Sequence, residues 1–161
     1  MLEDVTPRKA VDFAIATEKL GAEVYGKLAK RFEGTSELRE LFSTLAKDEV
    51  AHEREFRALR ERLPADTGPA QYEQQQYLRA MAISEVFSDE HGIHRHIDKV
   101  RTREDALDRA LSLEKATLML YFAMKEVIGP NEALDAIIAA EKRHVVQVTQ
   151  YSITGESVKG L

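Results

Sequence analysis

Apolar and small side chains recur along the chain at steps of three and four residues in four long segments. This spacing is typical of helices that bury one face against a common core. The segments span about residues 7–32, 36–63, 103–128 and 132–151. Their apolar stripes consist of Val11, Ile15, Ala22, Tyr25, Ala29 and Phe32; Leu38, Phe42, Leu45, Phe56, Leu59 and Leu63; Leu107, Leu111, Leu118, Tyr121 and Ile128; and Leu134, Ile138, Val145, Val148 and Tyr151. The pattern predicts an all-α protein with four main helices.

Residues that begin and end helices stand at the borders of these segments. The candidate N-caps are Thr6, Thr35 or Ser36, Thr102 and Asn131, and Pro7 suits the first helical position. The candidate stops are Gly34, Pro64 and the pair Gly129 and Pro130. The connections inside residues 8–63 and 102–152 are short, so we expect each range to form an antiparallel helical hairpin.

Residues 64–101 connect the two expected hairpins. Within them, the stretch from Tyr77 to about His91 is expected to form a short extra helix. A connection of this length can run along the whole bundle, as it does in ferritin-like folds. We therefore expect one domain over residues 1–161, a ferritin-like four-helix bundle with one long crossover, and a polar tail over residues 153–161.

The composition of the chain mainly argues against certain classes of protein. The 161 residues are 43% hydrophobic, which suits one globular domain, and the apolar runs are too short to span a membrane. A formal net charge of -5 without a basic patch argues against a nucleic-acid partner. The first residues show no secretory signal, so we expect a cytoplasmic protein. Cysteine is absent, which excludes disulfides, thiolate metal sites and a thiol nucleophile within this chain.

Ionisable side chains interrupt every apolar stripe. They are Glu18 in the first helix, Glu49 and His52 in the second, Glu114 in the third, and Glu141 and His144 in the fourth. Burial of an unpaired carboxylate is unfavourable because the charge loses its contact with water. Four such carboxylates, one on each helix, therefore indicate a shared binding partner.

The two hairpins repeat one arrangement of these groups. A shift of 96 positions places Glu18 on Glu114 and Tyr25 on Tyr121, and a shift of 92 superimposes the two Glu-x-x-His pairs. In the first hairpin, a rise of 1.5 Å per residue places Glu18 roughly 21 Å and Glu49 roughly 18 Å from the connection. Antiparallel packing therefore brings these two carboxylates to nearly the same level.

The spacing suits a pair of metal ions. Residues three apart share a helix face, so each Glu-x-x-His pair offers an oxygen and a nitrogen to one cavity. With one further Glu from each remaining helix, this is the ligand set of di-iron and di-manganese bundles. The expected ligands are Glu18 and Glu114 at the two ends, Glu49 and Glu141 as bridges, and His52 and His144 as one nitrogen ligand per metal.

Charge and ligand type narrow the identity of the ions. Four carboxylates balance two divalent cations, and mixed carboxylate and imidazole ligands suit iron or manganese, with zinc possible in an isolated sample. The alternative interpretation is a polar network inside a metal-free bundle.

With these motifs the sequence resembles the rubrerythrin and erythrin branch of the ferritin-like superfamily. The resemblance covers residues 8–151 except the crossover and rests on six residue types, their order and two Glu-to-Tyr spacings. It implies two iron ions that cycle between Fe(II) and Fe(III) while hydrogen peroxide or oxygen is reduced. It also implies that Tyr25 and Tyr121 lie beside the ligand carboxylates, and plain core packing is the alternative for both.

Two features depart from typical rubrerythrins. Those proteins usually carry a rubredoxin-like domain with four cysteines, which this chain lacks, so electrons are expected from an external donor protein or from ferrous iron. They also place a second Glu three residues after the third-helix ligand, where this chain has Thr117. A ferroxidase and a metal-free or zinc-bound interaction module stay open as alternative functions. We expect a homodimer or a higher homo-oligomer for each of them.

The other ionisable residues of the crossover are spaced in a way that is less suited to a metal or catalytic site. Glu85 is expected on a solvated helix face rather than as a further ligand. Glu90, His91, His94 and His96 lie close in sequence. Gly92 interrupts their helical spacing, so we expect a pH-sensitive surface patch there or no role at all. The C-terminal tail contains no pattern that indicates a function.

Overall fold

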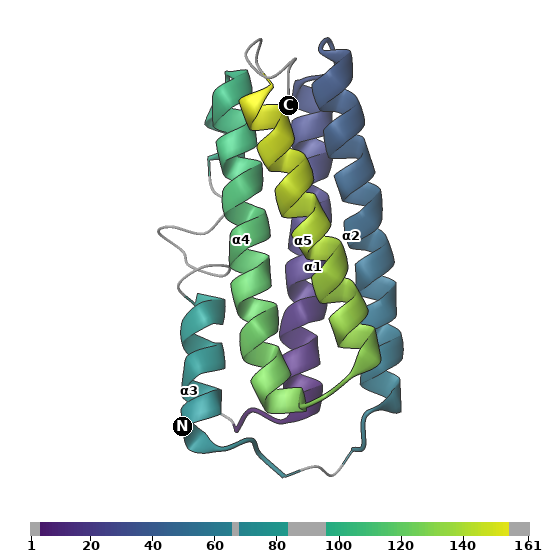
Figure 1. Cartoon of the computed structure of the whole chain (residues 1–161), viewed down its shortest axis with the longest axis vertical. Helices are drawn as coiled ribbons and strands as arrows, with labels where there is room; N and C mark the ends of the chain where they lie inside the picture. The colour runs from purple at the N-terminus through teal and green to yellow at the C-terminus, as the bar shows by residue number, and fades with distance from the viewer. Residues whose placement is uncertain (1–3, 66–67, 84–95, 155–161) are drawn as a thin grey trace.

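Five α-helices and a short 3-10 helix form the secondary structure that the computed structural model assigns to residues 4–65, 68–83 and 96–154, and no strand occurs among these described residues. The elements are α1 (Pro7–Arg31), α2 (Ser36–Arg62), α3 (Tyr72–Met81), η2 (Ile97–Lys99), α4 (Arg103–Ile128) and α5 (Glu132–Ile153). The four long helices lie side by side, as Figure 1 shows. The expected all-α bundle is confirmed.

The order of the helices explains the need for a long crossover. In Figure 1, α1 and α2 form one antiparallel hairpin and α4 and α5 form another. Helices α2 and α4 run in the same direction, so the chain must return along the bundle between them. Helix α3 forms part of this return and packs beside α4. This is the connectivity of a ferritin-like bundle.

The helix ends follow the sequence signals closely. The side chains of Thr6, Thr102 and Asn131 accept hydrogen bonds from backbone N–H groups in the first turns of their helices. Thr35 is the N-cap of α2, but its side chain makes no capping hydrogen bond. Gly129 ends α4 with a φ of 79°, a conformation that favours glycine because it has no Cβ. These local signals are sufficient to place the long helices.

The short helix of the crossover begins earlier than the sequence indicated. It spans Tyr72–Met81, whereas we expected a start at Tyr77, and the expected end at His91 lies outside the described residues. The reason is a capping box in which the side chains of Gln71 and Gln74 each accept a hydrogen bond from the other residue's backbone N–H. A glutamine-rich tract that resembles a linker therefore forms the first turn of α3.

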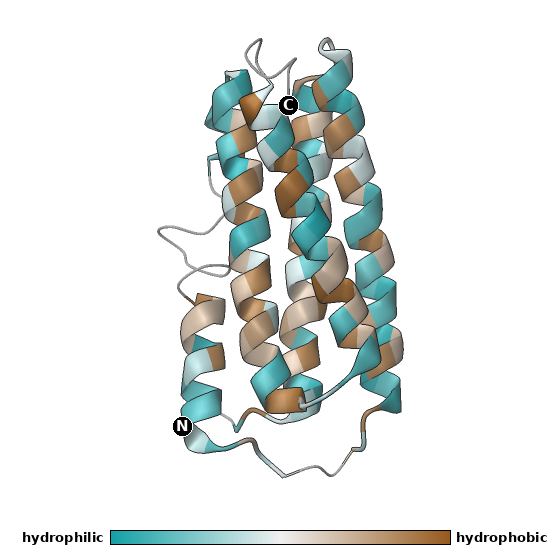
Figure 2. Cartoon of the chain, in the orientation of Figure 1, coloured by the Kyte–Doolittle hydropathy of each residue, from teal (hydrophilic) through white to brown (hydrophobic). Residues whose placement is uncertain are grey.

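The core between the long helices is built from large apolar side chains around two tyrosines. Tyr25 stacks on Phe42 with ring centroids 6.2 Å apart, and Tyr121 meets Phe56 edge-on at 5.1 Å. Both tyrosines are fully buried. Brown apolar residues alternate with teal polar ones along every long helix in Figure 2. No described helix is long and apolar enough to cross a membrane.

Gln75 connects the crossover to the start of the chain through hydrogen bonds. The side chain of Gln75 accepts a hydrogen bond of 2.9 Å from the backbone N–H of Val5 and donates one of 2.7 Å to the carbonyl of Ala70. Ala70 in turn donates its backbone N–H to the carbonyl of Val5 at 3.0 Å. This small network is buried. If the Gln75 side chain is lost, polar backbone groups are left without a hydrogen-bond partner, and water cannot replace it.

Replacement of Gln75 by alanine should therefore lower the free energy of unfolding by about 1–3 kcal/mol, the usual effect of an unsatisfied buried group. Chemical denaturation measures this loss. Gln76→Ala is the matched control, because Gln76 is exposed and lies on the same helix. An equal effect of the two substitutions would show that the Gln75 network does not stabilise the fold.

Candidate metal centre

The six ionisable residues that interrupt the apolar stripes meet in the middle of the bundle. They come from all four long helices, and each is buried, with at most 6% of its surface exposed. The set is Glu18, Glu49, His52, Glu114, Glu141 and His144. We call it the polar cluster. Helix periodicity places these residues on inward faces, and antiparallel pairing within each hairpin brings them to one level.

The ligand atoms of the polar cluster fall into two overlapping groups. Glu18 and His52 belong to the first group, and Glu114 and His144 belong to the second. Glu49 and Glu141 belong to both. Within each group, one ligand atom from every residue lies within 4.8 Å of the others. Each group therefore has the composition of a metal site with three carboxylates and one imidazole, and the groups share two carboxylates.

Glu141 lies between the two imidazoles. Its Oε1 is 2.6 Å from Nδ1 of His52, and its Oε2 is 3.3 Å from Nδ1 of His144. Nδ1 of His144 also lies 3.5 Å from Oε2 of Glu114 and 3.7 Å from Oε1 of Glu49. The two imidazole rings face each other with centroids 5.5 Å apart. One carboxylate thus reaches both ends of the polar cluster.

Six buried atoms of the polar cluster make no hydrogen bond of good geometry within the described part of the chain, although several of them lie within ion-pair distance of one another. They are Oε2 of Glu18, Nδ1 of His52, Oε2 of Glu114, both side-chain oxygens of Glu141 and Nδ1 of His144. Buried polar atoms are rarely left unpaired, because the unmade bond is unfavourable. Oxygen and imidazole donors that lie this close together match the coordination demands of divalent transition metals. The residues present therefore fit a metal centre.

Two tyrosines connect the hairpins across the polar cluster. The hydroxyl of Tyr25 in α1 donates to Oε1 of Glu114 in α4, and the hydroxyl of Tyr121 in α4 donates to Oε1 of Glu18 in α1. Burial, together with the charge of the accepting glutamate, raises the pKa of both hydroxyls well above its ordinary value, so they stay protonated donors. Each bond occupies one carboxylate oxygen and leaves Oε2 directed to the cluster.

The buried charges compensate one another only in part. Burial raises the pKa of Glu18 and Glu49, and it raises that of Glu114 to about 7. Burial acts in the same direction on Glu141, but its contacts with His144 and His52 outweigh it and lower the pKa to about 2. Without metal, Glu141 is therefore an anion between two imidazoles, while its neighbours tend to hold protons.

The imidazoles carry the matching positive charge. Burial lowers the pKa of His144, but the nearby Glu114 and Glu141 carboxylates outweigh burial and raise it to about 11. His52 is shifted in the same direction because Glu141 outweighs the effect of burial. Protons thus occupy the positions that a metal ion needs.

Gly21 makes room for a cluster carboxylate and was missed by the sequence reasoning. A Cβ atom on Gly21 would lie 3.0 Å from Oε2 of Glu49, a tighter contact than most Cβ atoms make, so the carboxylate would have to shift. The shift of 96 positions places Gly21 on Thr117, which is buried in α4. The signal was available in the sequence, because Gly21 follows Glu18 by the same three positions that separate Thr117 from Glu114.

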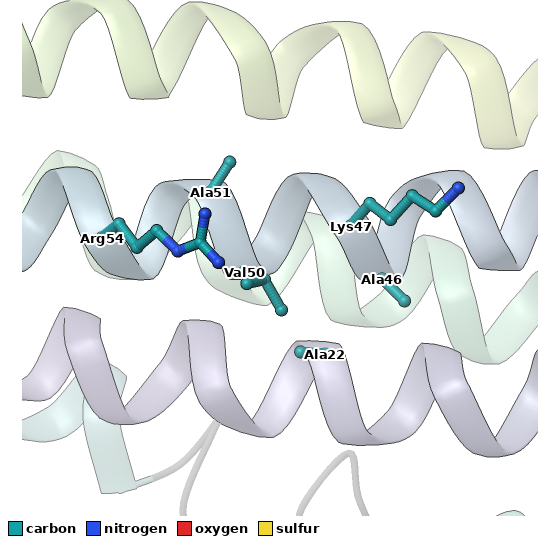
Figure 3. Close-up of a pocket in the computed structure, with 6 residues that line it drawn as sticks. All are labelled: Ala22, Ala46, Lys47, Val50, Ala51 and Arg54. Carbon is teal, nitrogen blue, oxygen red and sulfur yellow. The ribbon is translucent and has the colours of Figure 1, made fainter.

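The other candidates from the sequence either lie outside the described residues or are exposed at the surface. Glu85, Glu90, His91 and His94 lie outside the described residues, and His96 is exposed at the start of η2. Figure 3 shows a surface hollow between α1 and α2, lined by Ala22, Ala46, Lys47, Val50, Ala51 and Arg54. None of these six side chains belongs to the polar cluster, so the hollow is a feature of the outer surface.

The fold and the polar cluster together define a ferritin-like carboxylate bundle, and comparisons with known proteins agree. Residues 9–147 match the rubrerythrin family, and the chain belongs to that family. A crystal structure from Thermotoga maritima, described as that of a ferritin-like diiron-carboxylate protein, has a similar fold with a TM-score of 0.68 and 25% identity. The match covers 94% of this chain and 97% of that one. No curated protein matches the sequence.

Binding of a divalent metal should release protons and strengthen as the pH rises. Metal ligands must be deprotonated. The pKa of Glu114, raised to about 7, and the raised pKa values of Glu18, Glu49 and His144 mean that these groups hold protons that the metal has to displace. Lower pH adds protons to the same atoms, so affinity should fall between about pH 8 and pH 5.

Calorimetric titration with Zn²⁺ in two buffers of different ionisation enthalpy measures the number of protons released. Glu23→Gln should leave that number unchanged, because Glu23 is exposed. Metal affinity that does not vary over this pH range would contradict the assignment of protons to the polar cluster.

Proposed function

We propose that this chain is a non-haem di-iron oxidoreductase of the rubrerythrin type, which reduces hydrogen peroxide or oxygen. The observation that carries the proposal is the pair of overlapping groups in the polar cluster, because two four-ligand sites with two shared carboxylates suit two adjacent ions. Membership of the rubrerythrin family supports the same interpretation.

In this proposal the roles of the residues follow from their place in the two groups. Glu49 and Glu141 belong to both groups and would bridge the ions. Glu18 with His52, and Glu114 with His144, would each complete one end. Four carboxylate charges balance two divalent ions, which explains why all four can be buried once metal is bound. Manganese or zinc suits the same donors, so the preference for iron rests on the family.

The chemistry divides between the metal and the chain. Bound ferrous ions would supply the two electrons that, with two protons, convert one hydrogen peroxide into two waters, each iron becoming ferric. Tyr25 and Tyr121 would hold the two end carboxylates in place through their hydroxyl groups. The surrounding apolar core would exclude bulk water from the reacting groups.

Continued turnover needs a source of electrons. The 161 residues contain no cysteine and hence no thiolate-bound iron that could deliver them. We therefore propose an external donor protein as the reductant. If ferrous iron itself is the donor, the same centre acts as a ferroxidase, which is the second candidate function.

Replacement of Glu141 by alanine should remove both ions, because its two oxygens face the two imidazoles. Glu18→Ala is the matched comparison and should weaken one end only, because Glu18 belongs to a single group. Iron content per chain, measured after anaerobic loading with circular dichroism as a check of folding, separates the two results. A Glu141→Ala protein that keeps one firmly bound iron would show that Glu141 is not a bridge.

Stopped-flow oxidation of the ferrous-loaded protein tests the reaction itself. Parallel mixing with peroxide and with oxygen should show much faster oxidation by peroxide if the protein is a rubrerythrin-type peroxidase. Faster reaction with oxygen, together with turnover of added ferrous iron, would favour the ferroxidase. Bound iron that reacts no faster than free iron with either oxidant would refute both and leave a structural helical module.

A further inference from the structure

One histidine of the polar cluster has a carboxylate partner on its outer side. Nε2 of His144 lies 3.2 Å from Oδ2 of Asp48. The other ring nitrogen of His144, Nδ1, faces the carboxylates of Glu49, Glu114 and Glu141. The ring therefore stands between an outer acceptor and the inner cluster. Asp48 precedes Glu49 on α2, so one turn of this helix supplies both a cluster carboxylate and the partner of a histidine from α5.

The internal repeat shows that the other histidine lacks this partner. The shift of 92 positions that places Glu49 on Glu141 places Asp48 on Ala140. Alanine has no side-chain acceptor, and no described residue forms a hydrogen bond with Nε2 of His52. The two ends of the polar cluster have equivalent inner ligands but different outer surroundings.

We propose that Asp48 is a positioning residue that makes the Glu114 and His144 end of the centre the stronger metal site, so that the two ions bind in order. The proposal rests on the function proposed above, because it assumes that the polar cluster holds two metals. A carboxylate that accepts the Nε2–H bond keeps the proton on that nitrogen, orients the ring and leaves the Nδ1 lone pair free for the metal. His52 must select its tautomer and orientation without such help, so its end should fill second.

The contact between Asp48 and His144 is expected to affect metal binding, whereas an ordinary surface ion pair affects only the stability of the fold. The side chain of Asp48 is 45% exposed, and exposed pairs stabilise a fold only slightly. A purely structural role would therefore lower the melting temperature slightly at most, and it would affect both metal-binding steps alike. A positioning role should leave the melting temperature of the metal-free protein nearly unchanged and weaken metal binding at one end.

Titration with Zn²⁺ tests the proposal on the full chain, because zinc occupies such donors without redox chemistry. Calorimetry on the original protein should resolve a stronger and a weaker step. Asp48→Ala should lower the affinity of the stronger step about 10- to 100-fold, the usual effect of removing a partner of a metal-bound histidine. The weaker step should change little. Asp48→Asn, whose amide oxygen can still accept from Nε2–H, should recover part of the loss.

Nuclear magnetic resonance of the ring nitrogens identifies which end fills first. At one equivalent of Zn²⁺, the signals of His144 should shift before those of His52, and a protected Nε2–H of His144 should be visible. In Asp48→Ala this order should weaken or disappear. In the double variant Asp48→Ala, Ala140→Asp, the carboxylate moves to the equivalent position of the repeat, from which it is expected to reach His52, and the order of filling should reverse. Glu55→Ala is the control, since Glu55 is an exposed carboxylate on the same helix.

The outcomes separate this inference from the function that it assumes. Two zinc ions of equal affinity in the original protein, or an equal loss of both steps in Asp48→Ala, would overturn the ordered filling and leave the two-metal centre intact. An Asp48→Ala protein with unchanged affinities would do the same. A protein that takes up no zinc, iron or manganese would overturn both proposals together.

Discussion

The structure depends on the burial of four carboxylates at one level of a helical bundle. Each of Glu18, Glu49, Glu114 and Glu141 is removed from water by the four long helices, and a buried charge is tolerated only when it is compensated. In the metal-free protein, protons and two imidazoles provide that compensation, with Glu141 as the anion between them. The buried leucine and phenylalanine side chains of the core supply the apolar burial that stabilises the bundle against this local penalty.

The bundle behaves as two related hairpins joined through their polar centre. Each tyrosine hydroxyl donates to a carboxylate of the other hairpin, so neither half completes its own hydrogen bonds. The repeat is imperfect at two places that matter for the centre. Gly21 leaves space for Glu49 where the second hairpin has Thr117. Asp48 reaches His144, whereas the equivalent position of the repeat, Ala140, has no side-chain acceptor for His52. An approximately symmetric ligand set therefore lies in asymmetric surroundings, which gives chemically similar ions different environments.

The crossover makes this arrangement possible. Because the chain returns along the bundle between α2 and α4, the second hairpin packs beside the first with its own inward faces at the same level. Helix α3 covers part of α4 during that return, and Gln75 ties it to the start of the chain. A direct short connection would instead have placed α4 antiparallel to α2 and changed which residues face each other.

Local periodicity and capping signals in the sequence were sufficient to predict the four long helices, the N-caps Thr6, Thr102 and Asn131, and the six residues of the polar cluster. Those features depend on spacings within one helix or one hairpin, where chain geometry fixes which side chains share a face. The early start of α3 was missed because a capping box between Gln71 and Gln74 outweighed the linker-like composition of that tract. Only the tertiary structure could decide that Tyr25 contacts Glu114, that Gly21 faces Glu49 and that Asp48 partners His144. These contacts join different helices, so they depend on the rotation and axial offset of packed helices, which no pattern within a single segment records.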